Sequence, residues 1–250
     1  MSVIVTANYK GETFEVEIFH DGGIEFPDRD LRYEQAEAEF RPPPSAVVEL
    51  YRYWHEASGC PMDVVLSNFE IPKEHKILLI SDYVEHVIDL YELEHDGDRM
   101  VRDIVDLSRM FVVGNVGLEV VGSARVKAGR FVSKAEEDDS TSDFTADEAV
   151  AASAEWLGLA VEASAPDSPH QVVDINKMAN WCAARARNAA AAAVVGLSDR
   201  DGGEVWGEDF RSKEHELAYK EEAMWQIRRF VDCMEAIGQG KGWPDMKVTP

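Results

Sequence analysis

The 48 acidic residues set the first condition on the fold, because a compact chain must keep nearly all of them at its surface. Only 25 Lys and Arg balance them, and the formal net charge is −23 over 250 residues. Charge of this size opposes compaction through self-repulsion, so it needs a reason: solubility, a high-salt environment or a positively charged partner. The 45% hydrophobic content and six Trp are sufficient for a substantial core, which indicates a folded protein with an acidic surface.

Composition also narrows the function classes. Direct binding of nucleic acid or anionic lipid is disfavoured, because both need Lys and Arg to neutralise phosphate. The sequence begins without the basic and apolar segments of a secretory signal, and it has no apolar run long enough to cross a membrane. Its three cysteines, Cys60, Cys182 and Cys233, are far apart and odd in number, as expected of reduced thiols. We therefore expect a cytoplasmic protein that contacts no membrane.

The pattern of residues 1–132 predicts an α+β domain. Strand-like runs separated by Gly-containing turns predict a β meander over the first thirty residues. In its second strand, Val16 and Ile18 alternate with Glu15 and Glu17, so one face should be buried and the other acidic. The elements expected after the meander are helices over 30–40, 45–57, 82–95 and 98–112, and short strands over 76–80 and 118–126.

Composition changes at Ser133, where an acidic segment predicts a linker over residues 133–144. Beyond it every periodic segment is helical, and Thr145 with Glu148 forms a T-x-x-E capping box. The expected parts are helices over 145–163, 172–195 and 212–237, which form a helical domain over residues 145–240, and a tail over residues 241–250. The predicted fold class is thus α+β: an N-terminal β meander with packed helices, followed by an all-helical C-terminal bundle.

The most distinctive charge pattern lies on the predicted helix over 82–95. Its acids follow spacings of 3, 4, 3 and 4, which place them on one helical face. This acidic stripe consists of Asp82, Glu85, Asp89, Glu92 and Asp96. Residues 81–98 contain seven acids and no Lys or Arg, whereas the next predicted helix interleaves both signs. Like charges four residues apart cost about a few tenths of a kcal/mol per pair, so a helix that keeps several of them favours a positive partner.

A row of acids at intervals of about 5–6 Å roughly imitates a phosphate strand. Several such rows could occupy the basic groove of a nucleic-acid-binding protein and gain the electrostatic steering that DNA gains there. Other acids that could extend this surface are Glu15, Glu17, Glu34 and Glu37. The leading hypothesis is a non-catalytic acidic protein without a cofactor that binds a basic protein as a nucleic-acid mimic. It would inhibit a DNA- or RNA-handling host defence system, as acidic antagonists encoded by phages and mobile elements do.

Other accounts of the acidity remain open. The stripe is equally typical of the solvated face of an amphipathic helix, and an acidic surface also suits adaptation to high salt. A structural or assembly protein is a further alternative, because the last predicted helix has a heptad pattern that could pack on a copy of itself. The residues of this heptad seam are Leu217, Met224, Ile227, Val231 and Met234.

A metal-dependent enzyme is the strongest catalytic alternative. Carboxylates and imidazoles three and four residues apart on one helix can share an ion. The candidate ligands are Asp82, His86, Asp89, Glu92 and His95. The sequence offers no matching set of ligands on other helices, and it has no G-x-S-x-G, no H-E-x-x-H and no complete phosphate loop. The sequence therefore favours a protein that is not an enzyme.

Overall fold

Two compact units divide the chain in this computed structural model. The sheet unit comprises Met1–Ile71 and Ile227–Pro244, and the helical unit comprises Pro72–Gln226 and Asp245–Pro250. The residues that the structure describes are 2–9, 11–19, 24–25, 46, 71–138, 145–166, 174–195, 213–238, 240–241 and 243. The helices predicted over 30–40 and 45–57 lie outside these ranges, apart from the single helical residue Ala46.

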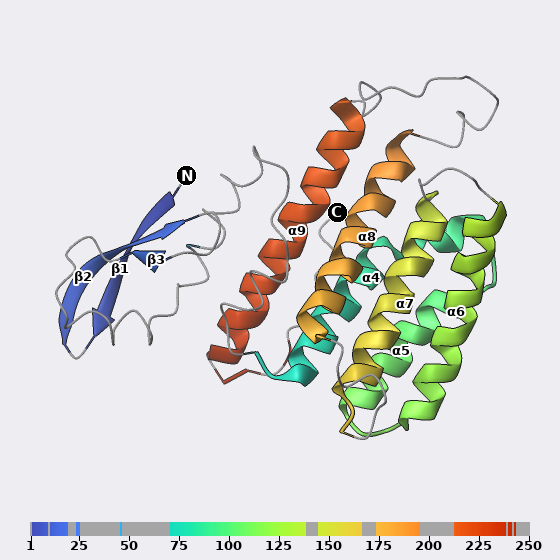
Figure 1. Cartoon of the computed structure of the whole chain (residues 1–250), viewed down its shortest axis with the longest axis horizontal. Helices are drawn as coiled ribbons and strands as arrows, with labels where there is room; N and C mark the ends of the chain where they lie inside the picture. Colours follow the sequence, from blue (N-terminus) through green and yellow to red (C-terminus); the bar gives the residue numbers. More distant parts are fainter. Residues whose placement is uncertain are drawn as a thin grey trace. The chain divides into compact units, whose positions relative to one another are not determined.

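The sheet unit contains an antiparallel sheet in the order β1-β2-β3 (Figure 1, blue). Its strands are β1 (Ser2–Tyr9), β2 (Glu12–Phe19) and β3 (Ile24–Glu25). A tight turn joins β1 to β2 at Gly11, whose φ of 87° is accessible to Gly without strain. Val16 and Ile18 on β2 are buried while Glu15 is exposed, so the predicted meander and its two-faced alternation are confirmed in the described strands.

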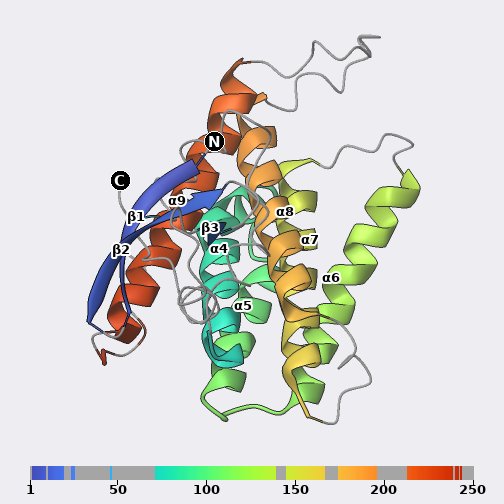
Figure 2. The same cartoon turned by 60° about the vertical axis from the view of Figure 1, so that its left-hand side comes forward.

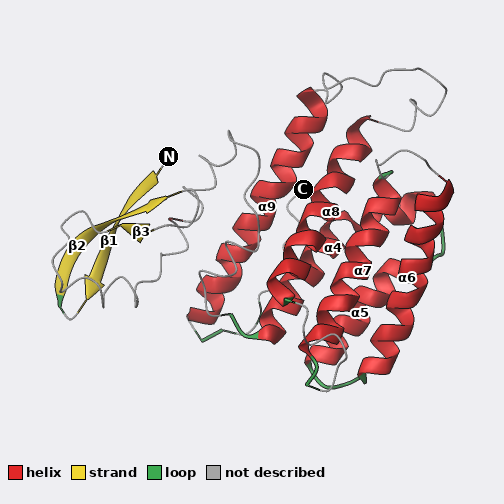
Figure 3. Ribbon diagram, in the orientation of Figure 1, coloured by secondary structure: helices red, strands yellow, loops and turns green. Residues whose placement is uncertain are grey.

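The described helices are shown in red in Figure 3. They are α4 (Lys73–Glu94), α5 (Met100–Val112), α6 (Leu118–Asp138), α7 (Ala146–Ser164), α8 (Ile175–Val195) and α9 (Lys213–Gly238). α6, α7 and α8 lie side by side, and α4 and α5 pack behind them, as both views show (Figures 1 and 2). The first part of α9, as far as Gln226, belongs to the helical unit and packs on α4 and α8.

α4 is buried around most of its circumference, because α5, α7 and α8 all pack on it. The strand predicted over 76–80 is wrong: Ile77, Leu79 and Ile80 are buried in the first turns of α4, which begins at Lys73. A short apolar run that is covered on all sides has the same pattern in a helix as in a strand. Asp82, the first residue of the helix predicted over 82–95, accordingly lies inside α4.

α6 corrects two further sequence predictions. The strand predicted over 118–126 is wrong, and α6 continues into the expected linker as far as Asp138. Its backbone approaches α7 closely at glycines: a Cβ on Gly158 of α7 would lie 2.8 Å from Cβ of Arg125. Arg125 also donates to Glu162 of α7 over 2.9 Å. This packing overrides the strand propensity of the valines in α6.

α7 and α8 meet through small residues, mostly alanines, that are buried along both helices. The capping box predicted for α7 is confirmed, with the backbone N–H of Thr145 donating to Glu148 over 2.8 Å. Deeper in the contact, the Ser153 hydroxyl donates to the carbonyl oxygen of Cys182 over 2.8 Å. The hydrogen bond from Ser153 to Cys182 helps to fix the register of two helices whose apolar side chains are small.

The structure supports a mostly helical α+β fold with a small antiparallel sheet. Residues 133–138 of the expected linker belong to α6, which packs on α7 within the helical unit. The helical unit also contains α4 and α5, and the domain boundary at residues 133–144 stays a prediction. None of the described helices is both long and apolar enough to cross a membrane.

Candidate functional site

α5 supplies arginines to the acidic stripe of α4. Arg109 donates through Nη2 to Oδ1 of Asp82 over 2.7 Å and to Oε2 of Glu85 over 2.6 Å. Burial lowers the pKa of Arg109, but the hydrogen bonds to Glu85 and Asp82 outweigh burial and raise it above its ordinary value. Asp82 is only 1% exposed, so this acid is part of the interior and does not reach a partner at the surface.

Arg102 of α5 also pairs with an acid of α4, nearer the other end of the contact between these two helices. Its Nε and Nη2 donate to the two carboxylate oxygens of Glu92 over 2.7 and 2.8 Å. This bidentate hydrogen bonding lowers the pKa of Glu92. The stripe was expected to lack local compensation, and for Asp82, Glu85 and Glu92 that expectation is wrong.

A sequence signal for this pairing does exist. Glu85 and Glu92 are seven residues apart, and so are Arg102 and Arg109. A spacing of seven residues keeps two side chains on the same helical face. Two antiparallel helices can therefore join them as a two-rung ladder, Glu85 with Arg109 and Glu92 with Arg102. We call this arrangement the α4–α5 ladder.

His86 belongs to a polar network with α9 and α8. Its Nδ1 lies 2.7 Å from Oε2 of Glu222, and its ring stacks on Trp225 with centroids 3.6 Å apart. The other Glu222 oxygen accepts from Nε2 of Gln226 over 3.1 Å, and the oxygen of Gln226 accepts from Arg187 over 2.9 Å. Glu222, Gln226 and Arg187 are all buried. The network attaches α9 to the other helices of the unit.

His95 also contacts a residue that is not part of the acidic stripe, because its Nε2 lies 2.9 Å from Oδ2 of Asp147 on α7. Asp147 is partly buried, which raises its pKa, but hydrogen bonds from Thr145, His95 and the backbone lower that pKa overall. The metal alternative needs His86 and His95 to turn towards shared carboxylates, and each instead has a partner on a different helix. Within the described ranges, no three or more His, Cys, Asp or Glu residues gather closely enough to hold a metal ion.

Three acids at the end of α4 and just beyond it remain exposed. Asp89, Glu94 and Asp96 have no cationic partner in the part of the chain that the structure describes. Leu93 lies among them and is 79% exposed. Of the five acids of the predicted stripe, Asp89 and Asp96 are thus the two that are exposed without a cationic partner among the described residues, and a binding role for them stays a prediction.

The end of α4 lies against α6 and α7, because His95 contacts Phe131 of α6 and Asp147 of α7. α9 contacts α4 farther back along the helix, where His86 meets Glu222. The exposed acids at this end of α4 form what we call the α4 acidic surface, which consists of Asp89, Glu94 and Asp96.

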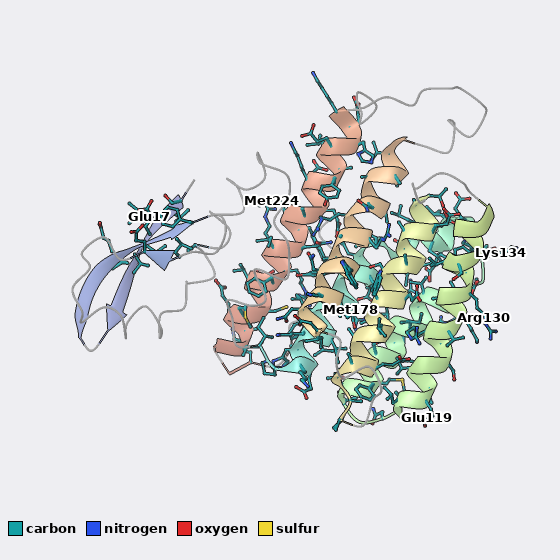
Figure 4. All side chains as sticks on the ribbon, viewed as in Figure 1. Glu17, Glu119, Arg130, Lys134, Met178 and Met224 are labelled. Carbon is teal, nitrogen blue, oxygen red and sulfur yellow. The ribbon has the colours of Figure 1, made fainter. Side chains whose placement is uncertain are left out.

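The other candidate acids are dispersed. Glu15 is exposed on β2, and Glu17, labelled in Figure 4, accepts a hydrogen bond from the Ser2 hydroxyl. Both belong to the sheet unit, whereas the acidic stripe belongs to the helical unit. Glu34 and Glu37 lie outside the described residues.

The heptad seam of α9 is not a uniform exposed face. Ile227 is completely buried, so its side chain is not available to a second copy. Leu217 is exposed, whereas Met224, Val231 and Met234 are half-buried. Association through this helix stays a prediction.

No protein-family model, curated protein or solved structure matches the chain significantly.

Proposed function

We propose that this chain is a non-catalytic binding protein that uses the α4 acidic surface to engage a basic, nucleic-acid-binding protein. One observation carries the proposal: on a helix whose other acids are held by arginines, Asp89, Glu94 and Asp96 are exposed without a cationic partner in the described ranges. An exposed carboxylate keeps its full charge for a partner, whereas a carboxylate paired with Arg does not.

The surroundings of these acids make them a rigid surface. α4 is buried on several sides, and the α4–α5 ladder and the His86 network attach it to its neighbours. Asp89 and Glu94 lie on α4 itself, and Asp96 lies in the turn just beyond it.

Exposed bases lie near this surface. Lys127, Arg130 and Lys134 are exposed along α6 and make no ion pair with a carboxylate of the described residues; Figure 4 labels Arg130 and Lys134. Arg130 precedes Phe131, whose ring contacts His95 at the end of α4. The α4 acidic surface therefore borders a basic stretch of α6, and a positive groove would be steered towards the acids and away from that stretch.

The proposal includes the biological setting inferred from charge. The protein would act in the cytoplasm and block a DNA- or RNA-handling defence system, in the manner of phage or mobile-element antagonists. Its partner would bind either the α4 acidic surface or nucleic acid, but not both.

A competition pull-down from the native host tests this function. Immobilised full-length protein should capture a basic nucleic-acid-binding protein at low salt, and duplex DNA should displace it. The variant Asp89→Asn/Glu94→Gln/Asp96→Asn should weaken capture by roughly tenfold or more, which corresponds to about 0.5 kcal/mol per charge. Capture that duplex DNA leaves unchanged would refute mimicry.

A charge-matched control separates this surface from the overall acidity. Glu74→Gln/Glu119→Gln/Glu235→Gln removes the same number of exposed carboxylates from other turns. The control should retain capture within about twofold. Equal losses in the two triple variants would mean that net charge, and not the α4 acidic surface, determines binding.

A further inference from the structure

β1 is an edge strand of unusual composition. In the described sheet it pairs with β2 along all eight residues and has no neighbour on its other side. Alternate backbone N–H and C=O groups of an edge strand point away from the sheet and are available to another strand. β1 reads SVIVTANY, with no charged residue and no Pro.

The other strands do carry the usual protection against edge pairing. β3 covers β2 only at Glu17 and Ile18, and the uncovered part of β2 contains Glu12 and Glu15. β3 has only two residues, of which Glu25 is charged. Short strands and charged side chains are the devices that keep edges apart. Among the described strands, β1 alone lacks both devices, although the chain as a whole is rich in acids.

The side chains of β1 determine what can pair with it. Val3 and Val5 share a face with the buried Val16 and Ile18, while Ile4 lies on the opposite face and is 62% exposed. A strand that pairs with β1 touches β1 directly but is two strand spacings, about 10 Å, from β2. The glutamates of β2 are therefore too distant to select a basic strand, and the fitting occupant is an uncharged, β-branched strand.

β1 itself has this chemistry. We propose that β1 pairs antiparallel with β1 of a second copy of this chain. Val3 and Val5 would then extend the apolar face across the junction. On the opposite face, β-branched side chains of the other copy would cover Ile4. No like charges oppose each other, because neither strand is charged.

This pairing would also enlarge the part of the sheet that the structure describes. Three strands, of which one has two residues, give limited cooperative support, and joining two copies produces a continuous six-stranded sheet. Each copy offers one such edge, so a two-fold axis closes the assembly at a dimer. The nearest acids lie on β2, where salt screens repulsion at distances of about 8–10 Å.

Light scattering on the full-length chain tests the proposal. The wild-type mass should rise with concentration from 27.9 kDa towards twice that value and no further. Ile4→Lys should weaken dimerisation at least tenfold while far-UV circular dichroism stays unchanged. The substitution lowers the net negative charge, so general electrostatics would favour association, and loss of the dimer would report on the strand itself.

Two additional measurements assign the interface. Thr6 lies on the same face of β1 as Ile4, so Thr6→Lys should also weaken dimerisation. Glu15→Lys on β2 should leave the dimer intact. Amide hydrogen exchange should show protection of alternate β1 residues in the wild-type dimer and loss of that protection on dilution. A wild-type chain that stays at 27.9 kDa, a dimer that survives both β1 substitutions, or masses beyond a dimer would overturn the proposal.

Discussion

The bridge from Arg109 to Asp82 and Glu85 should contribute strongly to stability, because Asp82 is buried. We consider the substitution Arg109→Met, which keeps an apolar stem and removes the cation that lies 2.7 Å from the Asp82 carboxylate. Breaking a buried ion pair by removing one partner costs about 3–5 kcal/mol. Arg109 is 31% exposed on its side chain, so water can partly replace it, and the loss should be about 3 kcal/mol.

Thermal and urea unfolding, followed by far-UV circular dichroism, would measure this loss. At about 2–4 °C per kcal/mol for a unit of this size, Arg109→Met should lower Tm by roughly 6–12 °C. The double variant Asp82→Asn/Arg109→Met removes both charges and should recover most of the stability. Arg99→Met is the matched control, because Arg99 is 60% exposed where it pairs with Asp103 and Asp106, and it should cost less than about 1 kcal/mol. A Tm for Arg109→Met within about 2 °C of the wild type would refute the burial argument.

Further perturbations test other contacts. Gly158→Ala should cost about 1–3 kcal/mol, because its Cβ would lie 2.8 Å from Cβ of Arg125, whereas Gly238→Ala, with nothing within 4 Å, should be nearly neutral in the same melts. Burial raises the pKa of Cys182 to about 12, so mass spectrometry should find this thiol unmodified by iodoacetamide at pH 8 until the protein unfolds; modification of the native chain would contradict its burial. The pKa of Asp147 is lowered in the folded state, so its stabilising contribution is present at neutral pH and is lost as pH falls through the folded pKa. Asp147→Asn should accordingly melt below the wild type at pH 7, with the gap closing below about pH 4, and a gap that is independent of pH would exclude this linkage.

Local signals predicted much of the secondary structure. The alternation in β2 and the capping box of α7 each depend on a few neighbouring residues, and both appear in the structure as expected. The segment 76–80 was misassigned because a fully buried apolar run has no polar face to reveal its period. The valines near the start of α6 were misassigned because its helical form depends on close contact with α7, which no local pattern contains.

The candidate site was harder to predict because it depends on how helices face each other. The periodicity of this helix alone predicted that Asp82 and Asp89 share a solvent-exposed face. In the structure, α5 covers Asp82 and leaves Asp89 exposed. The arginines of α5 were visible in the sequence, yet their role requires knowing that α4 and α5 are antiparallel neighbours. The matching seven-residue spacings were the one clue to that arrangement.

The α4–α5 ladder also constrains how this sequence can change over evolutionary time. Replacing Glu92 by Arg would oppose two cations, and replacing Arg102 by Glu would oppose two anions, but both changes together restore the pair with its polarity reversed. The same holds for Glu85 and Arg109 only when Asp82 changes too, because that acid shares the Arg109 cation. Distant relatives should therefore preserve one rung as a covarying pair and the other as a covarying triplet, even where the individual charges differ.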